Sequence, residues 1–377
     1  MSKVFAIVAG EASGDQLGAP LIKELKKRYP DAKFIGIGGD KMIKQGLESL
    51  FEMERLSVMG LFEVLSRLPE LLKIRKTLKD YFIANPPDVF IGIDAPDFNL
   101  PLAKMLKLAG IKTVHYVCPS VWAWREKRVE KIKLSVDTML CLLPFEVDFC
   151  NKHQLNAKFV GHTLADKITI EKQSDYARKE LAIDLESHVL CMMPGSRQSE
   201  IKRMAPLFIE AVNLIHKEVP FLHVIIPVAN EKRKLQLNEY LKNAKFDYQI
   251  IHQNSIQALN AANVALITSG TAALEAMLCK TPMVVSYKAN WLTYKIISKL
   301  LTIDYVSLPN IIANKPIVKE LIQDDATVDN IKNEMLKIMD QQNQLIQIQE
   351  FATLHKTLIA KADIQAANAI DNLIKPI

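Results

Sequence analysis

The sequence predicts an α/β protein built from two doubly wound domains. Its 377 residues are 49% hydrophobic and 24% charged, which is typical of a globular protein, and the length fits two domains better than one or four. Short runs rich in Val and Ile alternate with segments of helical period, as in βαβ units around a parallel sheet. The runs form two sets of about five, which favours two sheets over one very wide sheet.

Ten strands follow from this pattern, five in each half. The runs are 4–9, 34–37, 89–93, 113–117 and 138–142, then 189–193, 223–227, 248–251, 264–267 and 283–286. We expect an N-terminal domain over 1–168, a polar linker with or without a helix over 169–187, and a C-terminal domain over 188–342. The tail, 343–377, carries apolar residues at helical spacing and is predicted to be helix.

Charge and cysteine content exclude several classes of protein. The five cysteines form no C-x-x-C pair, so neither a disulfide framework nor a zinc ribbon is indicated, and a reducing cytoplasm is expected. No export signal and no 18-residue apolar run is evident. The net charge of +6 lies in the first half, with 28 basic against 22 acidic residues up to position 179 and 20 against 20 beyond. This favours a surface that meets anions, but without aromatic arrays or dense Lys/Arg runs nucleic acid is not favoured.

Two polar segments follow strands of the first half. Glu11, Ser13 and Gly14 belong to a small-residue turn after the first strand, where α/β domains bind ligands through backbone N–H groups. A tight turn with Ser13 capping the next helix explains the segment equally well. Asp94 ends the strand at 89–93, where a carboxylate can serve as a general base. Either Asp94 or Asp97 could instead cap the following helix, and Asp97 is the better candidate for that role.

A third segment places aromatic and polar residues around one strand exit. It contains His115, Trp122, Trp124 and Arg125. Such sets occur in sugar-binding sites, but from spacing alone two tryptophans beside a bend are more often packing.

The second half repeats the arrangement of strand, small-residue turn and helix. Gly195, Ser196 and Arg197 follow its first strand, and backbone N–H groups with a guanidinium can hold a diphosphate without a metal. Further residues follow its fourth strand: Ser269, Gly270, Thr271 and Glu275. The helix start suits phosphate and Glu275 can accept two ribose hydroxyls, although a capping box begun by Thr271 explains the pattern equally well.

Together these motifs resemble those of the lipid-A-disaccharide synthase family. S-V-W-A-W-R at 120–125 and D-Y-V-S-L-P-N at 304–310 are its most specific sequences, and the resemblance spans most of the chain. One departure is Cys118, where we expected Ser. The segments that carry the resemblance are 10–15, 58–60, 92–99, 115–117, 119–125, 161–163, 194–197, 269–275 and 304–310.

The resemblance implies an inverting glycosyltransferase of the GT-B fold, with two Rossmann-like domains facing a cleft. It would join UDP-2,3-diacylglucosamine to 2,3-diacylglucosamine 1-phosphate by a β-1,6 bond and release UDP, with no metal or other cofactor. Asp94 would take the proton of the acceptor 6-hydroxyl, Arg197 would stabilise the departing UDP, and Glu275 would hold the ribose. Substrate or nucleotide contacts are also implied for Glu11, Ser13, Gly14, His115, Trp124, Gly195, Ser196, Ser269, Gly270, Thr271 and Asn310.

Two related functions remain alternatives. They are the transferase that adds N-acetylglucosamine to a peptidoglycan precursor and a UDP-sugar epimerase, which share the fold. The motif set as a whole argues against both.

The segment 56–82 is the predicted membrane contact. Its apolar residues fall mostly at helical spacing and alternate with Arg and Lys, so it either packs on its own sheet or docks at an anionic surface. Acylated substrates favour docking at the inner face of the cytoplasmic membrane of a Gram-negative bacterium, and self-association is left open. Pro69 predicts two short helices or a hinge. The residues expected to touch acyl chains are Val58, Leu61, Phe62, Leu65, Leu68 and Leu72.

Overall fold

The computed structural model describes residues 2–375 except 57–60, 291–293, 296–299 and 301–302, and it describes no side chains for 61–65. The chain forms two compact units, one of residues 1–166 and 358–377 and the other of 167–357. The polar stretch 169–187 therefore lies in the second unit, where it contains helix α9 (Ser174–Glu180). The segment expected as a single tail is divided between the units.

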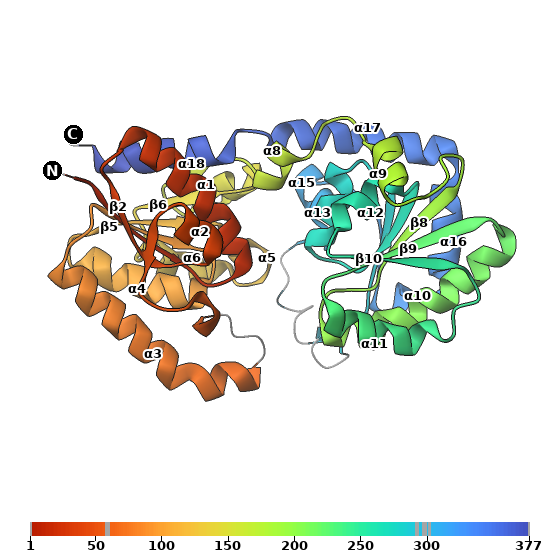
Figure 1. The fold of residues 1–377 in the computed structure, drawn as a ribbon, viewed down its shortest axis with the longest axis horizontal. Coiled ribbons are helices and arrows are strands. Elements are labelled where there is room, and N and C mark those ends of the chain that lie inside the picture. Colours follow the sequence, from red (N-terminus) through yellow and green to blue (C-terminus); the bar gives the residue numbers. More distant parts are fainter. Residues whose placement is uncertain (1, 57–60, 291–293, 296–299, 301–302, 376–377) are drawn as a thin grey trace. The chain divides into compact units, whose positions relative to one another are not determined.

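The first unit contains a parallel sheet of seven strands in the order β3-β2-β1-β4-β5-β6-β7. Strands β2, β5 and β6 of this sheet are labelled in Figure 1. The five predicted strands are confirmed within one residue at each end. The sequence pattern missed β3 and β7, which are three residues long and lie at the two edges, where few apolar residues are needed. The strands are β1 (Val4–Ala9), β2 (Lys33–Ile37), β3 (Leu47–Ser49), β4 (Val89–Ile93), β5 (Lys112–Tyr116), β6 (Thr138–Cys141) and β7 (Ala157–Phe159).

The second unit contains a parallel sheet of six strands in the order β10-β9-β8-β11-β12-β13. All five predicted strands are again confirmed, and the missed strand, β13, lies at an edge. The strands are β8 (His188–Met193), β9 (Leu222–Val228), β10 (Tyr248–His252), β11 (Val264–Ile267), β12 (Met283–Tyr287) and β13 (Lys319–Ile322). Both sheets thus have the strand order of doubly wound domains.

Helices cover both faces of the first sheet because successive side chains of a buried strand point to opposite faces. Phe5, Ile7 and Ala9 of β1 pack with α1 and α18, whereas Ala6 and Val8 pack in the cluster that contains α3 and α4. The helices of this unit are α1 (Ala12–Arg28), α2 (Asp40–Lys44), α3 (Leu61–Ala84), α4 (Pro96–Leu108), α5 (Val121–Trp124), α6 (Val129–Lys133), α7 (Pro144–Lys152), α8 (Thr163–Lys167, whose last residue falls in the second unit) and α18 (Ala362–Ile374).

Helices α10, α11 and α16 supply the apolar core on one face of the second sheet. Helices α12 and α13 contact the strands as well, and α9 packs on α12. The helices of this unit are α9, α10 (Gln198–Glu218), α11 (Glu231–Leu241), α12 (Ser255–Ala261), α13 (Thr271–Leu278), α15 (Leu308–Ala313), α16 (Val328–Met339) and α17 (Gln341–Leu358, whose last residue falls in the first unit). Short 3₁₀ turns occur at Met53–Arg55, Glu126–Arg128 and Gln323–Asp325.

Helix α3 runs through Pro69 as one helix, so the expectation of two short helices or a hinge was wrong. A proline inside a helix removes one backbone hydrogen bond and costs about 3 kcal/mol. Packing of the C-terminal part of α3 offsets such a cost, since Ile74, Leu78 and Phe82 are buried in the core. Helices α1, α4 and α10 also contain a proline each.

The C-terminal tail is helical, as expected, but it forms α17 and α18 rather than one helix. Lys361 between them has a φ of 57°, a left-handed conformation that ends regular helix. Asp166 then fixes the start of α18, because its carboxylate accepts the N–H groups of Ala360, Lys361 and Ala362.

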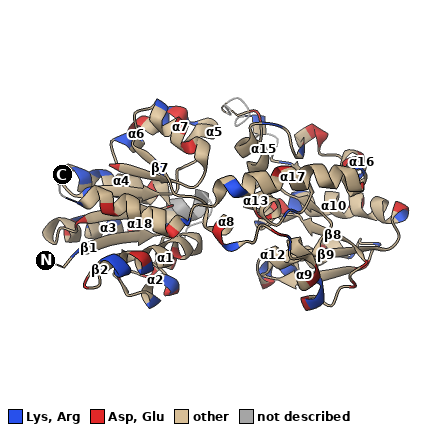
Figure 2. Ribbon diagram, turned by 90° about the horizontal axis from the view of Figure 1, so that it is seen from above, with Lys and Arg blue, Asp and Glu red and all other residues tan. Residues whose placement is uncertain are grey.

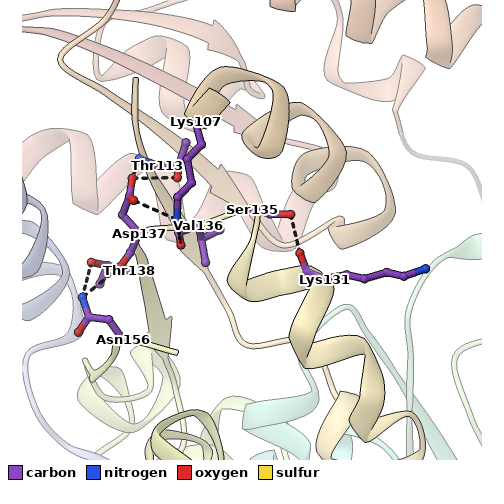
Figure 3. Close-up of polar contacts among 8 residues, drawn as sticks. All are labelled: Lys107, Thr113, Lys131, Ser135, Val136, Asp137, Thr138 and Asn156. Carbon is purple, nitrogen blue, oxygen red and sulfur yellow. Dashed lines mark hydrogen bonds and ion pairs between the residues drawn. The ribbon is translucent and has the colours of Figure 1, made fainter. Parts of the chain in front are cut away.

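Polar contacts hold the amino ends of β5 and β6 together (Figure 3). The Asp137 carboxylate accepts the N–H and hydroxyl of Thr113 at 2.8 and 3.1 Å and pairs with the Lys107 ammonium at 3.0 Å. Asn156 donates to the Asp137 carbonyl and the Thr138 hydroxyl. These bonds lie at the end of the sheet opposite to the strand ends from which the predicted motifs start.

Basic and acidic residues occur together on helices of both units in the view of Figure 2, as at α2 and α16. Among the described residues, no helix combines the length and the apolar character needed to cross a bilayer.

Candidate functional site

Each unit brings two of the predicted motifs together at one place in its sheet. β1 lies beside β4 in the first unit, and β8 lies beside β11 in the second. In each case the chain reverses its winding between these strands, and the crevice outside their carboxyl ends is where doubly wound domains bind ligands. The turn containing Gly10 follows β1 and the Asp94 turn follows β4. The Gly195 and Gly270 turns likewise follow β8 and β11.

Asp94 stands in a strained turn. Asp94 and Ala95 have φ values of 50° and 43°, a left-handed conformation that non-glycine residues seldom adopt and that persists only where the surroundings enforce it. A Cβ on Gly10 would lie 2.9 Å from the Ala95 Cβ, so glycine allows the two turns to touch. Burial raises the pKa of Asp94, and a hydrogen bond from the Ala95 backbone partly opposes the rise.

Asn99, which sequence reasoning did not single out, holds this turn from inside. The side chain is fully buried, and its amide donates to the carbonyls of Val8, Ile93 and Asp94 at 3.2, 3.3 and 2.9 Å. Asp97 points elsewhere, since its carboxylate is 87% exposed and pairs with Arg128 at 2.8 Å. The geometry therefore gives Asp94, rather than Asp97, the surroundings of a base.

The residues after β1 divide between surface and interior. Glu11 is the N-cap residue of α1, with no capping bond from its side chain, and Ser13 is exposed inside the helix. Ser13 therefore does not cap α1, as one alternative supposed. Gly14 is buried against β1, and the buried Asp15 accepts the N–H groups of Gly39, Lys41 and Met42, which fixes α2.

The aromatic segment is partly core. His115 is fully buried, and burial lowers its pKa to about 3, so it is neutral. Neither of its ring nitrogens has a hydrogen-bond partner among the described residues. Trp122 packs edge-on against Phe145, with ring centroids 4.8 Å apart. Trp124 is half-exposed and carries the Arg125 guanidinium 4.0 Å above its ring.

Glu200 occupies the turn after β8. Its carboxylate accepts the N–H groups of Ser196 and Arg197, both at 3.1 Å, and pairs with the Arg197 guanidinium at 3.0 Å. Gly195 has a φ of 118°, and a Cβ there would lie 2.4 Å from the Glu200 Cβ. These two N–H groups are therefore already bonded to a carboxylate. The Arg197 side chain remains 72% exposed.

The turn after β11 is open by comparison. Gly270, at a φ of 140°, is the N-cap residue of α13, and no side chain caps this helix start. Thr271 lies inside the helix, so it is not the N-cap of a capping box. Ser269 is half-exposed. Glu275, one turn further on, is half-buried, and the Ser255 hydroxyl donates to its carboxylate at 2.7 Å. Burial raises the pKa of Glu275 and the Ser255 bond opposes the rise.

Asn310 lies in a buried network instead of an open turn. Its side-chain amide bonds both backbone groups of Val318 and the Glu320 carboxylate, all at 2.8 Å. Glu320 also accepts the N–H groups of Val306 and Ser307. The specific motif at 304–310 thus fixes α15 to the edge strand β13, and it does so through a glutamate that sequence reasoning missed.

The predicted membrane residues are described only in part. Leu68 and Leu72 are 41% and 49% exposed. Val58 and the side chains of Leu61, Phe62 and Leu65 lie outside the described residues. Several nearby basic side chains are engaged, because Arg67 pairs with Glu70, and Lys76 and Lys79 pair with Asp80.

In the described part of the chain, one group of His, Cys, Asp and Glu side chains is compact enough to share a metal ion. It consists of Cys118, Cys141 and Cys150, all buried. It contains no carboxylate, so it is not of the kind that binds Mg²⁺ or Mn²⁺ with a diphosphate.

Comparison with solved structures identifies the fold. The glycosyltransferase of kitacinnamycin matches with a TM-score of 0.67 at 15% identity, over 99% of both chains. UDP-GlcNAc 2-epimerase from Neisseria meningitidis, bound to UDP-GlcNAc, matches with a TM-score of 0.62 at 13% identity, again over 99% of both chains. The chain therefore has the GT-B fold, as predicted.

Sequence comparison defines the family within that class. A family model described as lipid-A-disaccharide synthetase matches residues 5–370. Lipid-A-disaccharide synthases of Vibrio parahaemolyticus and Aliivibrio fischeri are 47% and 49% identical, each over 98% of this chain and 98% and 96% of their own lengths. The chain belongs to the lipid-A-disaccharide synthase family, which confirms the resemblance found in the motifs.

Proposed function

We propose that this protein transfers 2,3-diacylglucosamine from its UDP carrier to the 6-hydroxyl of 2,3-diacylglucosamine 1-phosphate, with inversion, and releases UDP. Family membership supports the reaction. The assignment of residues rests on the position of the motifs. In each unit two motifs meet at the switch point of the sheet. One switch point offers a base and the other offers groups that suit an anion.

Asp94 is the proposed base. Inverting displacement at the anomeric carbon needs the acceptor hydroxyl to lose its proton as the new bond forms. A carboxylate with a raised pKa is a stronger base than an ordinary one. The left-handed turn and its bonds from Asn99 hold Asp94 at the strand end instead of against the helix, so the side chain is available to the acceptor.

UDP is proposed to bind at the second unit. The uncapped start of α13 supplies N–H groups for phosphate, and the exposed Arg197 adds a positive charge that stabilises the leaving diphosphate. Because Glu200 holds the N–H groups of Ser196 and Arg197, we assign the phosphate contact to the α13 start and the guanidinium, and give the β8 turn a supporting role. Glu275, fixed by Ser255, is placed to accept ribose hydroxyls.

The transfer itself is proposed to need no metal, since Arg197 and the helix start provide the charge that a metal would otherwise provide. The exposed Leu68 and Leu72 of α3 are proposed to contact the acyl chains at the inner surface of the cytoplasmic membrane. Such contact would hold the protein at the membrane surface, where its acylated substrates lie.

Product analysis tests the proposed reaction. The purified protein is incubated with both diacylglucosamine substrates, and the products are identified by mass spectrometry and by the stereochemistry of the new bond. We expect a β-1,6 disaccharide 1-phosphate and one UDP for each disaccharide. UDP-N-acetylglucosamine without acyl chains serves as the matched donor. Transfer from that donor, or its epimerisation, would contradict the proposal in favour of the two alternative functions.

A further inference from the structure

Three cysteines from separate elements of the first unit converge in its core. Cys118 follows β5, Cys141 ends β6 and Cys150 lies in α7. Their sulfur atoms all lie within 4.8 Å of one another. Cys118 is 5% exposed and the other two are fully buried. No part of the proposed transfer reaction uses these thiols.

The spacing of the sulfurs matches what one thiophilic ion requires. Three sulfurs around an ion with metal–sulfur bonds of about 2.3 Å lie roughly 4 Å apart when the ion is in their plane. Sulfurs that lie within 4.8 Å of one another therefore need only small side-chain rotations to reach this spacing. A donor set made only of sulfur selects soft ions over Mg²⁺, Ca²⁺ and Mn²⁺.

The surroundings of the cluster limit the charge of the ion. A divalent ion with three thiolates carries one net negative charge, whereas a monovalent ion would leave two, which is costlier in an apolar core. The nearby Glu146 carboxylate is buried and accepts the N–H groups of Leu142 and Leu143, so it is not counted among the ligands.

We propose that Cys118, Cys141 and Cys150 form a binding site for one thiophilic divalent ion of the zinc group. Each thiol that ligates the ion loses its proton to solvent and forms one metal–sulfur bond, and no electron transfer is involved. The ion would link α7 and β6 to Cys118, which directly precedes the segment 119–125 that contains Trp124. None of the three thiols has a role in the proposed transfer, so the proposal is independent of the proposed function.

Cadmium titration of the full chain tests the site. The protein, reduced with a phosphine, is titrated with Cd²⁺ while the thiolate-to-metal absorption is followed in the ultraviolet. We expect saturation at one ion per chain, as one cluster of three thiols requires. A chain that shows no saturable component at this stoichiometry overturns the proposal.

Cys118→Ser is the diagnostic variant, because Ser is the residue that the motif led us to expect at this position. Its Cd²⁺ affinity should fall by more than the roughly 10–100-fold that loss of an outer-shell partner costs. Cys279→Ser, in the second unit, is the matched control and should bind as the parent does. A far-ultraviolet circular dichroism spectrum and a Tm like those of the parent show that Cys118→Ser is folded. If this folded variant retains the parent affinity, the site is not at these thiols. Should it fail to fold, Cys150→Ser is titrated in its place, and the parent affinity in that folded variant would overturn the site.

Discussion

The two units share one sheet topology, but the groups at the carboxyl ends of their central strands differ in charge. In the first unit the strand ends present a carboxyl group, Asp94, with a raised pKa in a strained turn. In the second unit they present the exposed guanidinium of Arg197 and a helix start that no side chain caps. Strand order determines where chemistry can occur in each sheet, and one or two residues at the strand ends determine which chemistry it is.

The two units also differ in how the local backbone is held. Asn99 holds the Asp94 turn by donating to three carbonyls, whereas Glu200 holds the Arg197 turn by accepting two N–H groups. The first device leaves a carboxylate free to accept a proton. The second fixes the turn with a negative charge close to the site proposed for a diphosphate, so we assign the attraction of the anion to the guanidinium and the α13 start.

The largest expected effect is on turnover, from the first unit. Asp94→Asn should lower kcat by ~10²-fold or more, the size of a lost general base. Asparagine accepts left-handed φ values well, so the turn should survive. Single-turnover kinetics with saturating donor and acceptor measure the effect, and UDP affinity should change little. Asp97→Asn is the matched control and should keep most activity. The assignment is reversed if Asp97 proves essential and Asp94 dispensable.

The next effect is on UDP affinity, from the second unit. Arg197→Ala should weaken UDP binding by about 1.5–3 kcal/mol, the value of a hydrogen bond to a charged group. Calorimetry on the folded variant measures this. Lys202→Ala, which removes an exposed charge from the same helix, is the control and should bind UDP normally. Unchanged UDP affinity in Arg197→Ala would show that this guanidinium does not bind the diphosphate.

A smaller effect concerns the acylated acceptor. Leu68→Ser with Leu72→Ser should raise KM for the acylated acceptor several-fold and reduce co-sedimentation with anionic liposomes, because two exposed apolar contacts are lost. UDP affinity should not change. Leu108→Ser, at an exposed position on α4, is the control. If the double variant sediments and turns over like the parent, α3 is not the docking surface.

The pH dependence of stability should separate Asp94 from ordinary carboxylates. Because folding raises the pKa of Asp94, the folded state binds its proton more tightly. The stability from this protonation is present below the unfolded pKa and is lost as pH rises through the folded value. Asp94→Asn should therefore have a higher Tm than the parent at pH 7, and the difference should shrink as pH falls towards the ordinary Asp pKa. A difference that does not vary with pH would mean that ionisation is not its cause.

The chemical step of transfer is expected not to depend on Mg²⁺ or Mn²⁺. Transfer should continue in excess EDTA, since guanidinium and helix N–H groups are proposed to stabilise the diphosphate. Rates before and after chelation, at equal ionic strength, measure this. Activity that is lost and then restored by Mg²⁺ or Mn²⁺ would refute it.

Sequence patterns identified the strands that have continuous apolar runs and the glycine-rich turns that follow them. Nine of the ten predicted strands lie inside the sheets and were found because they are buried on both faces. The tenth, β10, is an edge strand that was found from its adjacent isoleucines, whereas the short edge strands β3, β7 and β13 escaped notice. Asp94 was found because it ends a buried strand. His115 was predicted as a contact, but alternation along β5 cannot tell which strand residues point into the core.

The residues that sequence reasoning missed are those whose role depends on a partner. Glu200 looks like any glutamate in a first helical turn, and only the φ of Gly195 brings it under two N–H groups. Glu320 and Ser255 act across 10 to 20 residues, and no local pattern shows such pairing. The persistence of α3 through Pro69 depends on packing of its distant half, which outweighs the local rule.

The return of α18 to the first unit has a consequence for how the protein is made. Ala366, Ala367 and Ile370 are fully buried beside residues of β5 and β6. During synthesis the first 166 residues leave the ribosome without this helix, and the apolar face that it covers stays bare until the whole second unit has been translated. The unit that comes first in the sequence is thus the last to be completed, and loss of the final twenty residues would injure the unit of Asp94 rather than the unit of Arg197.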